Sequence, residues 1–273
     1  MGSRPTVSVI VTTKNNQNTL GICLQSIVKQ SYQPIEIIVV DNYSDDDTLN
    51  IAKRYATEVY TQGFERCTQR NYGVSKSTGE YVMIIDSDMK LETDVVAACV
   101  KMVEDNTKIA GVVIPEESYG VGFWAKCKQL ERSFYQGVDW MEAARFFSRE
   151  TFDQAGGYDE SLVSGEDWDL SQRVGEIGKI NRINQYIRHN EGELKLIRTL
   201  KKKLYYAREF KKYTAKTSST NVKGQTGIIK RYSLFFRHPG RLFANPILGL
   251  GMLTMKTLEF LVGGVGYLTT QKD

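Results

Sequence analysis

Two aspartates separated by one serine, Asp86-Ser87-Asp88, directly follow the apolar run Tyr81–Ile85. In an extended segment alternate side chains point to one side, so the two carboxylates would lie about 7 Å apart with Ser87 opposite. Carboxylate oxygens at a strand end are ligands for Mg²⁺ or Mn²⁺, and such a metal neutralises a leaving diphosphate. A solvated acidic turn would have the same sequence, but the position after a buried run favours a metal site.

A second group of acids, Glu166, Asp167 and Asp169, surrounds Trp168 at the start of a short helix expected at 168–176. Acids in a first turn commonly complement the helix dipole. Alternatively, one of these carboxylates removes the proton of an acceptor hydroxyl as that oxygen attacks. One base without a covalent nucleophile predicts a single displacement with inversion at the reacting carbon.

The elements that must position these residues alternate between strand and helix. Strands are expected at 7–13, 35–40, 58–61, 81–85 and 109–114, and helices at 20–28, 46–55, 66–77 and 93–104. This alternation predicts a mostly parallel sheet with helices on both faces, whose ligands bind beyond the carboxyl ends of the strands. Asp41 ends the second strand, where it could accept a hydrogen bond from a nucleotide base, and Ser44 is the expected N-cap of the next helix.

The turn after the first strand, TTKNNQN, lacks two common nucleotide-binding patterns. Without GxGxxG a nicotinamide or flavin dinucleotide is disfavoured, and without GxxxxGK[ST] a P-loop is excluded. The four cysteines form no CxxC pair, so we expect reduced thiols in or near the core, as is usual in the cytoplasm.

The chain changes character after Pro115 and again at Lys195. A helix at 122–135, strands at 143–148 and 180–187 and a turn at 156–158 are expected between these points. From Lys195 to Arg241 there are 14 Lys and Arg against one acid, whereas the remainder has 22 basic and 31 acidic residues. We predict a catalytic domain at 1–194, with halves at about 1–115 and 116–194, and a basic, amphipathic, membrane-associating region at 195–273.

Two apolar segments, 242–255 and 260–268, lie near the C-terminus, separated by Lys256 and Glu259. Each is shorter than the roughly 20 residues that a membrane span needs. With the nearby arginines and aromatics they predict a hairpin in the membrane interface. A packed helical subdomain and a bilayer span are the alternatives.

Five blocks of sequence occur in the order VSVIVTTKNN, IEIIVVDNYSDDDT, QRNYGVSKSTGEYVMIIDSD, FFSRETFDQAGGYDE and GEDWDLSQRV. Their order and spacing, over residues 7–189, resemble the inverting family 2 glycosyltransferases of GT-A fold. The resemblance implies a Rossmann-like α/β domain with a mostly parallel central sheet, and transfer of a sugar from a nucleotide-sugar donor.

The resemblance also implies roles on the donor side. Thr12 and Asp41 look like the pocket for the nucleotide base and ribose, and Arg70 is similar to the position that approaches the nucleotide or its phosphates. Asp86 and Asp88 match the metal-binding pair for Mn²⁺ or Mg²⁺, with Asp88 as the direct ligand and Asp86 also near the nucleotide.

On the acceptor side, Asp167 looks like the catalytic base and Glu166 like its neighbour or an acceptor ligand. Trp168 would form a wall against the acceptor sugar. His189, at the end of the last strand, has three possible roles: a contact to the metal or diphosphate, a contact to the acceptor, or a structural role.

The stretch KLIRTLKKKLYY resembles the tails of bacterial and archaeal members that act on polyprenyl-linked sugars. This agrees with the separation of charge along the chain, and a solvated basic face is the alternative. The cations expected to meet anionic lipid or a lipid diphosphate are Lys201, Lys202, Lys203, Arg231, Arg237 and Arg241. We therefore expect a cytoplasmic enzyme, peripheral at the inner face of the cell membrane.

The favoured interpretation is a metal-dependent inverting transferase that moves a sugar, with UDP-sugars favoured, to a hydroxyl of a glycan or polyprenyl-linked glycan. A polyprenyl-phosphate sugar synthase is the alternative within the class, since a phosphate acceptor needs little deprotonation. A sugar-nucleotide pyrophosphorylase would carry a Gly-rich basic loop after the first strand, which TTKNNQN is not. A nucleic-acid binder is indicated only by the basic tail and lacks a reading motif.

Overall fold

The computed structural model describes residues 4–216 and 225–269, which belong to two compact units. The first unit comprises Met1–Glu116, Ala143–Glu160 and Glu166–Asn190, and the second comprises Glu117–Glu142, Ser161–Gly165 and Glu191–Asp273. The expected acceptor half, about 116–194, is thus divided between the units. The functional division at residue 195 stays a prediction.

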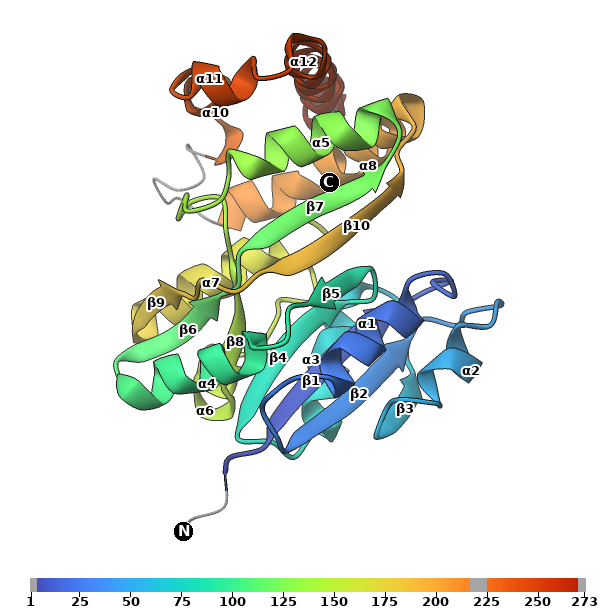
Figure 1. Ribbon diagram of the computed structural model, residues 1–273, viewed down its shortest axis with the longest axis vertical. Helices are drawn as coiled ribbons and strands as arrows, with labels where there is room; N and C mark the ends of the chain where they lie inside the picture. The colour runs from blue at the N-terminus through green and yellow to red at the C-terminus, as the bar shows by residue number, and fades with distance from the viewer. Residues whose placement is uncertain (1–3, 217–224, 270–273) are drawn as a thin grey trace. The chain divides into compact units, whose positions relative to one another are not determined.

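The first unit is built on a seven-stranded sheet of order β3-β2-β1-β4-β8-β6-β9 (Figure 1). Its strands are β1 (Val7–Thr13), β2 (Ile35–Asp41), β3 (Glu58–Thr61), β4 (Tyr81–Asp86), β6 (Ile109–Val113), β8 (Ala144–Ser148) and β9 (Lys179–Arg182). β8 runs antiparallel to β4 and β6, whereas β1 is parallel to both of its neighbours. β1 is apolar almost throughout because it is buried on both faces.

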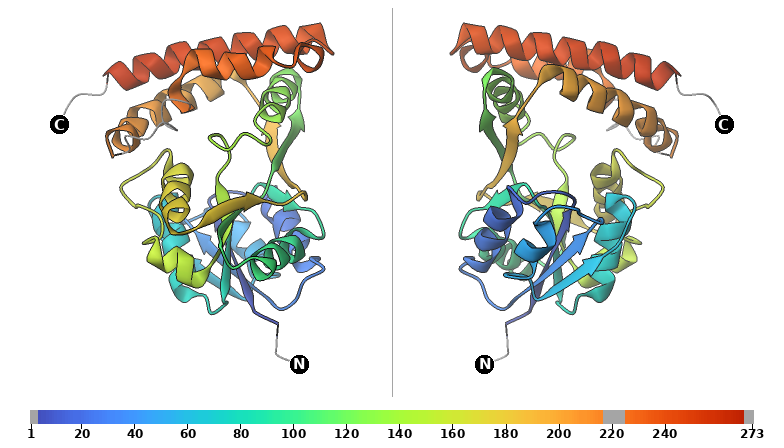
Figure 2. Two further views of the ribbon diagram at one scale, coloured as in Figure 1. Left: turned by 90° about the vertical axis from the view of Figure 1, so that its left-hand side faces the viewer. Right: turned by 90° about the vertical axis from the view of Figure 1, so that its right-hand side faces the viewer.

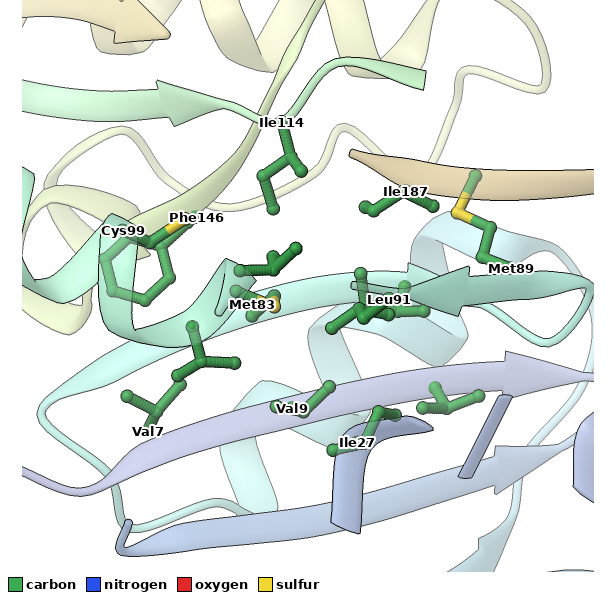
Figure 3. Close-up of a cluster of buried hydrophobic side chains, with 14 of the residues drawn as sticks. Val7, Val9, Ile27, Met83, Met89, Leu91, Cys99, Ile114, Phe146 and Ile187 are labelled. Carbon is green, nitrogen blue, oxygen red and sulfur yellow. The ribbon is translucent and has the colours of Figure 1, made fainter. Parts of the chain in front are cut away.

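Helices cover both faces of this sheet. They are α1 (Leu20–Val28), α2 (Thr48–Ala52), α3 (Arg66–Lys76), α4 (Val95–Asp105), α6 (Arg149–Gln154) and α7 (Glu166–Ile177). Alternate side chains of a strand point to opposite faces, so Val7 and Val9 of β1 pack with residues of α1 and α4 (Figure 3). Ile10 points the other way and packs with residues of α3, α6 and α7.

A second sheet has the order β5-β10-β7. Its strands are β5 (Met89–Leu91), β7 (Glu116–Val121) and β10 (Ile187–Glu193). β10 runs antiparallel to β5, with His189 opposite Met89, and the Asn190 N–H donates to the Asp88 carbonyl at 2.9 Å. This pairing holds the backbone of Asp88 beside that of His189.

The second unit is largely helical. Its helices are α5 (Phe123–Ser133), α8 (Leu196–Lys216), α10 (Ile228–Phe236), α11 (Pro239–Leu242) and α12 (Pro246–Thr269). α12 packs against α8 and α5 (Figure 2). The apolar core of this unit includes Cys127, Phe134, Phe235, Met252 and Met255.

Four charged side chains are buried together in the second unit. Lys256 of α12 donates to Glu131 of α5 at 2.6 Å and to Glu259 at 2.9 Å. Lys128 of α5 donates to Glu131 at 2.8 Å and to Glu259 at 3.2 Å. Each lysine therefore lies between both glutamates, and the cluster carries no net charge.

The sequence prediction of an α/β fold with a mostly parallel sheet is confirmed. The strands at 7–13 and 58–61 and the helix at 20–28 have the expected bounds, and most other elements differ by one to three residues. All four cysteines are free and buried, as expected.

Several local predictions are wrong. The expected strand at 180–187 is two strands, β9 and β10, and the short elements β5, β7 and α6 were not foreseen. Ser44 does not cap α2, because its hydroxyl donates to Asp41 and helix α2 begins only at Thr48.

The two apolar segments near the C-terminus do not form a hairpin. From Pro246 onward they are parts of one continuous helix, α12, in which Lys256 and Glu259 are paired within the core instead of interrupting the helix. Among the described residues, one helix, α12, is long and apolar enough to cross a membrane by length and composition, which alone is weak support for a span.

Candidate active site at the carboxyl ends of the strands

The sheet register brings the predicted donor-side residues to one edge. Thr12 of β1 lies opposite Asp86 of β4, and Thr13 lies opposite Asp41 of β2. The three strands are parallel neighbours, so their carboxyl ends meet at the place where open α/β sheets bind ligands.

Asp41 is fully buried and holds the loop that follows β2. Its Oδ2 accepts the Ser44 N–H at 2.8 Å and its Oδ1 accepts the Ser44 hydroxyl. Ser44 in turn accepts the N–H of Asn15, which has a φ of +50°. Asp41 thus ties the loops after β1 and β2 together, and its contact with a nucleotide base stays a prediction.

The DSD segment is a turn, not the extended segment assumed from the sequence, because β4 ends at Asp86 and β5 begins at Met89. Ser87 is buried and accepts a hydrogen bond from the Asn16 side chain at 2.7 Å. The two aspartates consequently have different neighbours: Asp86 contacts arginines, and Asp88 contacts a histidine.

Arg70 joins the two predicted acidic motifs. Its guanidinium is fully buried, with Nη2 2.9 Å from Asp86 Oδ1 and Nη1 2.9 Å from Asp167 Oδ1. Glu166 lies further away, at 3.4 Å from Nη1. Burial would lower the pKa of Arg70, but Asp167 and Asp86 raise it well above its ordinary value. In the structure Arg70 has three carboxylate partners, and its expected approach to the nucleotide or its phosphates stays a prediction.

Asp167 keeps more exposure than its partners, at 28% of its side chain. Oδ1 accepts from Arg70 and also from the Tyr158 hydroxyl at 3.1 Å. Burial and the nearby Asp167 raise the pKa of Tyr158, so this hydroxyl remains a neutral donor. Asn71 fixes Tyr158 through hydrogen bonds to its backbone N–H and carbonyl, at 2.9 and 2.8 Å.

The other acids of this motif have different surroundings. Glu166 is 6% exposed and pairs with Arg66 at 3.1 Å, and burial together with Asp167 raises its pKa. Asp169 is bound by Arg173 at 2.6 Å, one turn further along α7. Trp168 is half-buried, and its contact with an acceptor sugar stays a prediction.

Arg145 and Glu116 form a connection that the sequence did not indicate. Arg145 is 8% exposed and donates to Glu116 Oε1 from Nη2 and Nε, at 2.7 and 2.9 Å. Its Nη1 lies 3.6 Å from Asp86 Oδ2. Burial would raise the pKa of Asp86, but Arg70 and Arg145 hold it well below its usual range.

His189 lies between two carboxylates. Its Nε2 is 3.4 Å from Asp88 Oδ2, and its Nδ1 is 3.4 Å from Glu116 Oε2. Burial would lower the pKa of His189, but its hydrogen bonds to Asp88 and Glu116 raise it to about 10. A path of polar contacts therefore links the two aspartates of DSD through Arg145, Glu116 and His189.

Acidic groups outnumber basic groups in this site. The carboxylates are those of Asp86, Asp88, Glu116, Glu166 and Asp167, and the basic groups are Arg66, Arg70, Arg145 and His189. Asp88 Oδ1 is buried and, among the described residues, has no hydrogen-bond partner. A buried carboxylate oxygen without a partner is costly, and a cation would remove that cost.

The carboxylate oxygens of this site fit a divalent cation that is bound together with a ligand. Within residues 4–216 and 225–269, no three His, Cys, Asp or Glu side chains are grouped so as to hold a metal by themselves. Mg²⁺ commonly binds one or two carboxylates and takes its other ligands from water and substrate phosphates. Asp88 is the available carboxylate, because the oxygens of Asp86 already face arginines.

Three site residues, Arg145, Glu116 and Tyr158, were not assigned from the sequence. Tyr158 lies within the FFSRETFDQAGGYDE block, where only a turn was expected. The glycine before it leaves no room for a Cβ, which would lie 2.8 Å from Asn71 Oδ1. In the sequence, the glycine pair before Tyr158 is the feature that could have indicated close packing of this turn on the helix of Arg70.

The glycosyl transferase family 2 model matches residues 8–158, more than half of the chain. The protein therefore belongs to glycosyl transferase family 2, as the sequence blocks predicted.

A curated relative and two solved structures are similar to this chain. Chondroitin synthase from Escherichia coli is 25% identical over 211 residues, which is 72% of this chain and 30% of the relative. A mannosyltransferase from Pyrobaculum calidifontis, solved with GDP-Man and Mn²⁺, has a TM-score of 0.67 at 16% identity and covers 99% of this chain and 89% of its own. S. aureus TarS 1–349, solved with UDP-GlcNAc, has a TM-score of 0.57 at 14% identity, over 97% and 91% of the two chains.

These likenesses support the fold more strongly than they support a substrate. The chain covers only part of the length of its curated relatives. It covers 30% of the chondroitin synthase, and 15% and 38% of the Streptococcus pneumoniae glycosyltransferases GlyA and GlyG. The structural neighbours share the fold at low sequence identity, which confirms the expected GT-A type of architecture.

Proposed function

We propose that the protein transfers a sugar from a nucleotide-diphosphate sugar to a hydroxyl of a glycan or polyprenyl-linked glycan. The reaction inverts the anomeric carbon and depends on Mn²⁺ or Mg²⁺, and UDP-sugars are the favoured donors. The solved neighbours carry GDP-Man with Mn²⁺ in one case and UDP-GlcNAc in another, so both nucleotides belong in a test.

One arrangement carries the proposal: Arg70 holds Asp86 and Asp167 at 2.9 Å each. Asp86 belongs to the motif expected to face the donor, and Asp167 to the motif expected to face the acceptor. Because one fully buried guanidinium binds both, the two motifs are fixed beside each other. Transfer between two substrates requires this proximity.

Asp167 is the residue we assign as general base. Its side chain is the more exposed of the acid pair, at 28% against 6% for Glu166. Arg70 and Tyr158 both bind Oδ1 and thereby orient the carboxylate, so we assign Oδ2 to take the proton of the acceptor hydroxyl. Glu166 is buried against Arg66 and Arg70 and supports the position of Asp167.

Asp88 is the residue we assign to hold the metal, with His189 beside it. When bound, a divalent cation would neutralise the charge that develops on the leaving nucleoside diphosphate. Arg70 and Arg145 place positive charge next to Asp86 and keep that carboxylate ionised and in position. Thr12 and Asp41 remain the proposed nucleotide contacts.

We assign the second unit to an anionic membrane surface at the cytoplasmic face. Lys201, Lys202 and Lys203 of α8 are exposed, as are Arg237 and Arg241. Arg231 differs from the expectation: it is 7% exposed, donates to the Gln225 carbonyl at 2.7 Å and lies over the Tyr135 ring at 5.0 Å. The basic surface therefore excludes Arg231.

α12 has an apolar exposed side, and its charged residues lie on its buried side together with apolar core residues. Lys256 and Glu259 are 5% and 3% exposed, whereas Ile247, Leu250 and Leu261 are 60% to 72% exposed. A helix in water normally has the opposite arrangement. An apolar exposed side and buried, neutralised charges suit a helix that lies in the membrane interface.

A hydrolysis screen tests the catalytic proposal. UDP-, GDP- and dTDP-sugars are incubated with the full chain and Mn²⁺ or Mg²⁺, and released nucleoside diphosphate is measured. At least one donor should be hydrolysed, and EDTA should stop the reaction until metal is restored. Asp88→Asn should lower the rate by about three orders of magnitude, since a catalytic metal supplies several kcal/mol.

Asp105→Asn, an exposed carboxylate at the end of α4, is the matched control and should keep full activity. If no donor is hydrolysed above the heat-inactivated protein, the proposed function is wrong. If hydrolysis is unchanged in EDTA and in Asp88→Asn, the transferase stands and the metal assignment falls.

Vesicle co-sedimentation tests the membrane assignment. Binding should require anionic lipid and weaken with salt, because charges are screened beyond a Debye length of about 8 Å at physiological ionic strength. Replacing Arg237 and Arg241 by Gln should weaken binding by about 1 kcal/mol for each charge. Equal binding to neutral and anionic vesicles would contradict the electrostatic part.

A further inference from the structure

A turn of two glycines precedes Tyr158, the residue whose hydroxyl binds the proposed base. Gly156 and Gly157 have φ values of +78° and +64°, in the region that favours glycine. Two glycines in succession have many alternative conformations in the unfolded chain, so neighbouring groups must hold the native turn. The turn, Tyr158 and Asp167 all belong to the first unit.

Arg173 of α7 holds this turn. Its Nη1 donates to the carbonyl of Ala155 and, at 2.8 Å, to that of Gly157. Its Nε and Nη2 donate to Oδ2 of Asp169 at 2.9 and 2.6 Å. Asp169 is 4% exposed and lies one turn earlier on the same helix. Because a planar guanidinium donates in several fixed directions at once, Arg173 binds the turn and its own helix together.

Helix α7 carries both Arg173 and the proposed base. Tyr158 directly follows the glycine that Arg173 binds, and its hydroxyl donates to Asp167 Oδ1 at 3.1 Å. Covalent bonds and hydrogen bonds therefore form a closed loop, which runs along α7, through the glycine turn and back to α7 by the Tyr158 hydroxyl. Most O–H···O bonds are about 2.5–3.0 Å long, so a shift of about 0.5 Å in the turn would break this contact.

We propose that Arg173 is a positioning residue for the base Asp167, and that Asp169 anchors it. Arg173 acts through the Tyr158 hydroxyl. Asn71 binds the backbone of Tyr158 from α3, so Arg173 supplies the connection to the helix that carries the base. A displacement of about 1 Å in a catalytic group can cost about 100-fold in rate. The kinetic part of this proposal rests on the proposed function, and the structural part does not.

Arginine-to-lysine variants of the full-length chain test the proposal. In Arg173→Lys the ammonium can still pair with Asp169, so that carboxylate is not left buried without a cation. A single nitrogen lacks the fork of donors that reaches the turn at the same time. Arg149→Lys is the matched control, because Arg149 also belongs to the first unit and also donates to two backbone carbonyls, those of Val74 and Gly79.

Hydrogen exchange at the Tyr158 amide, which donates to Asn71 Oδ1, measures how firmly the turn is held. Exchange there should be about tenfold faster in Arg173→Lys than in the wild type. Arg149→Lys should stay within about twofold of the wild type.

A double-mutant cycle measures whether Arg173 acts through Tyr158. The reaction is hydrolysis of the donor found by the screen, in which water takes the place of the acceptor hydroxyl. Arg173→Lys and Tyr158→Phe should each lower kcat about tenfold and change the donor KM less than about twofold. Because both substitutions act on one hydrogen bond, the double variant should be within about twofold of the slower single variant. Arg149→Lys should keep kcat within about twofold of the wild type.

Two results would overturn the positioning role. One is that Arg173→Lys affects exchange and kcat no more than Arg149→Lys does. The other is that the losses from Arg173→Lys and Tyr158→Phe multiply in the double variant, since the two residues would then act independently. If exchange responds as expected but no donor is hydrolysed, the support of the turn by Arg173 stands and the proposed function fails.

Discussion

Both units bury clusters of charged side chains, but the two clusters differ in balance and in access. In the second unit, two lysines and two glutamates neutralise one another, and the side chains of Glu131 and Glu259 are 1% and 4% exposed. In the first unit, five carboxylates face three arginines and one histidine, and Asp88 and Asp167 are 37% and 28% exposed.

We interpret the difference as one between a structural cluster and the proposed active site. Every charge in the buried cluster of the second unit has a partner of opposite sign, as burial requires. The cluster in the first unit keeps excess negative charge and leaves one buried oxygen of Asp88 without a hydrogen-bond partner among the described residues. Such incomplete pairing costs stability, and it is expected where a ligand or a cation completes the site.

The largest expected effect is the loss of transfer rate in the variant Asp167→Asn. This substitution keeps the shape of the side chain and removes its basicity. The rate should fall by about 10²–10⁴, the usual contribution of a general base, with donor affinity retained. Glu166→Gln should be milder, because Glu166 is buried against Arg66 and Arg70.

The product configuration is determined by NMR in the same experiment. Retention at the anomeric carbon would overturn the single-displacement mechanism. Normal transfer with inversion by Asp167→Asn would leave the enzyme class intact and remove only the assignment of the base.

A large effect on stability is expected at Lys256. Lys256→Met leaves Glu131 and Glu259 buried with one lysine between them, so the free energy of unfolding should fall by about 3–5 kcal/mol. Adding Glu131→Gln removes the excess charge and should recover most of that loss. Denaturant unfolding measures both variants, and equal stability of the single variant and the wild type would show that the cluster is not structural.

The sequence predicted the first unit much better than the second. Apolar runs such as residues 7–13 determine a buried strand, and the DSD and GED motifs contain Asp86 and Asp167, which Arg70 brings together. Arg145 and Glu116 could not be found in this way, because each lies in a segment without a motif and they meet only in the folded chain. α12 was divided incorrectly because its two charges look like interruptions until their partners on α5 are known.

The pH dependence of the free energy of unfolding provides a smaller test of the difference between the two clusters. Burial would raise the pKa of Glu131, but Lys128 and Lys256 hold it well below its ordinary value. A lowered pKa in the folded state stabilises the protein above the unfolded pKa of about 4.3, and this stabilisation is lost as the pH falls through the folded value.

The wild type should therefore lose stability below about pH 4.3 more steeply than the double variant Lys256→Met/Glu131→Gln, because the variant lacks the titrating Glu131. Thermal unfolding of both proteins between neutral pH and acid measures this difference. Identical pH profiles would mean that Glu131 is not held ionised by the two lysines.

The smallest expected effect is on the stability of Asp88→Asn, and its sign is the sharpest test of the comparison. In the absence of metal, this substitution removes one of five carboxylates from a site with excess negative charge. Asp88 Oδ1 lacks a hydrogen-bond partner among the described residues, so little attraction is lost at that atom. Oδ2 makes a long hydrogen bond to His189, at 3.4 Å, and Glu116 contacts the same imidazole at 3.4 Å, so the loss of the Asp88 contact is offset by the relief of excess negative charge.

The free energy of unfolding in EDTA should therefore stay within about 1 kcal/mol of the wild type or rise, even though activity is lost. Mn²⁺ should stabilise the wild type through preferential binding to the folded state and should have little effect on Asp88→Asn. A loss of several kcal/mol in EDTA would place Asp88 with the structural charges of the second unit, and the distinction between the two clusters would fail.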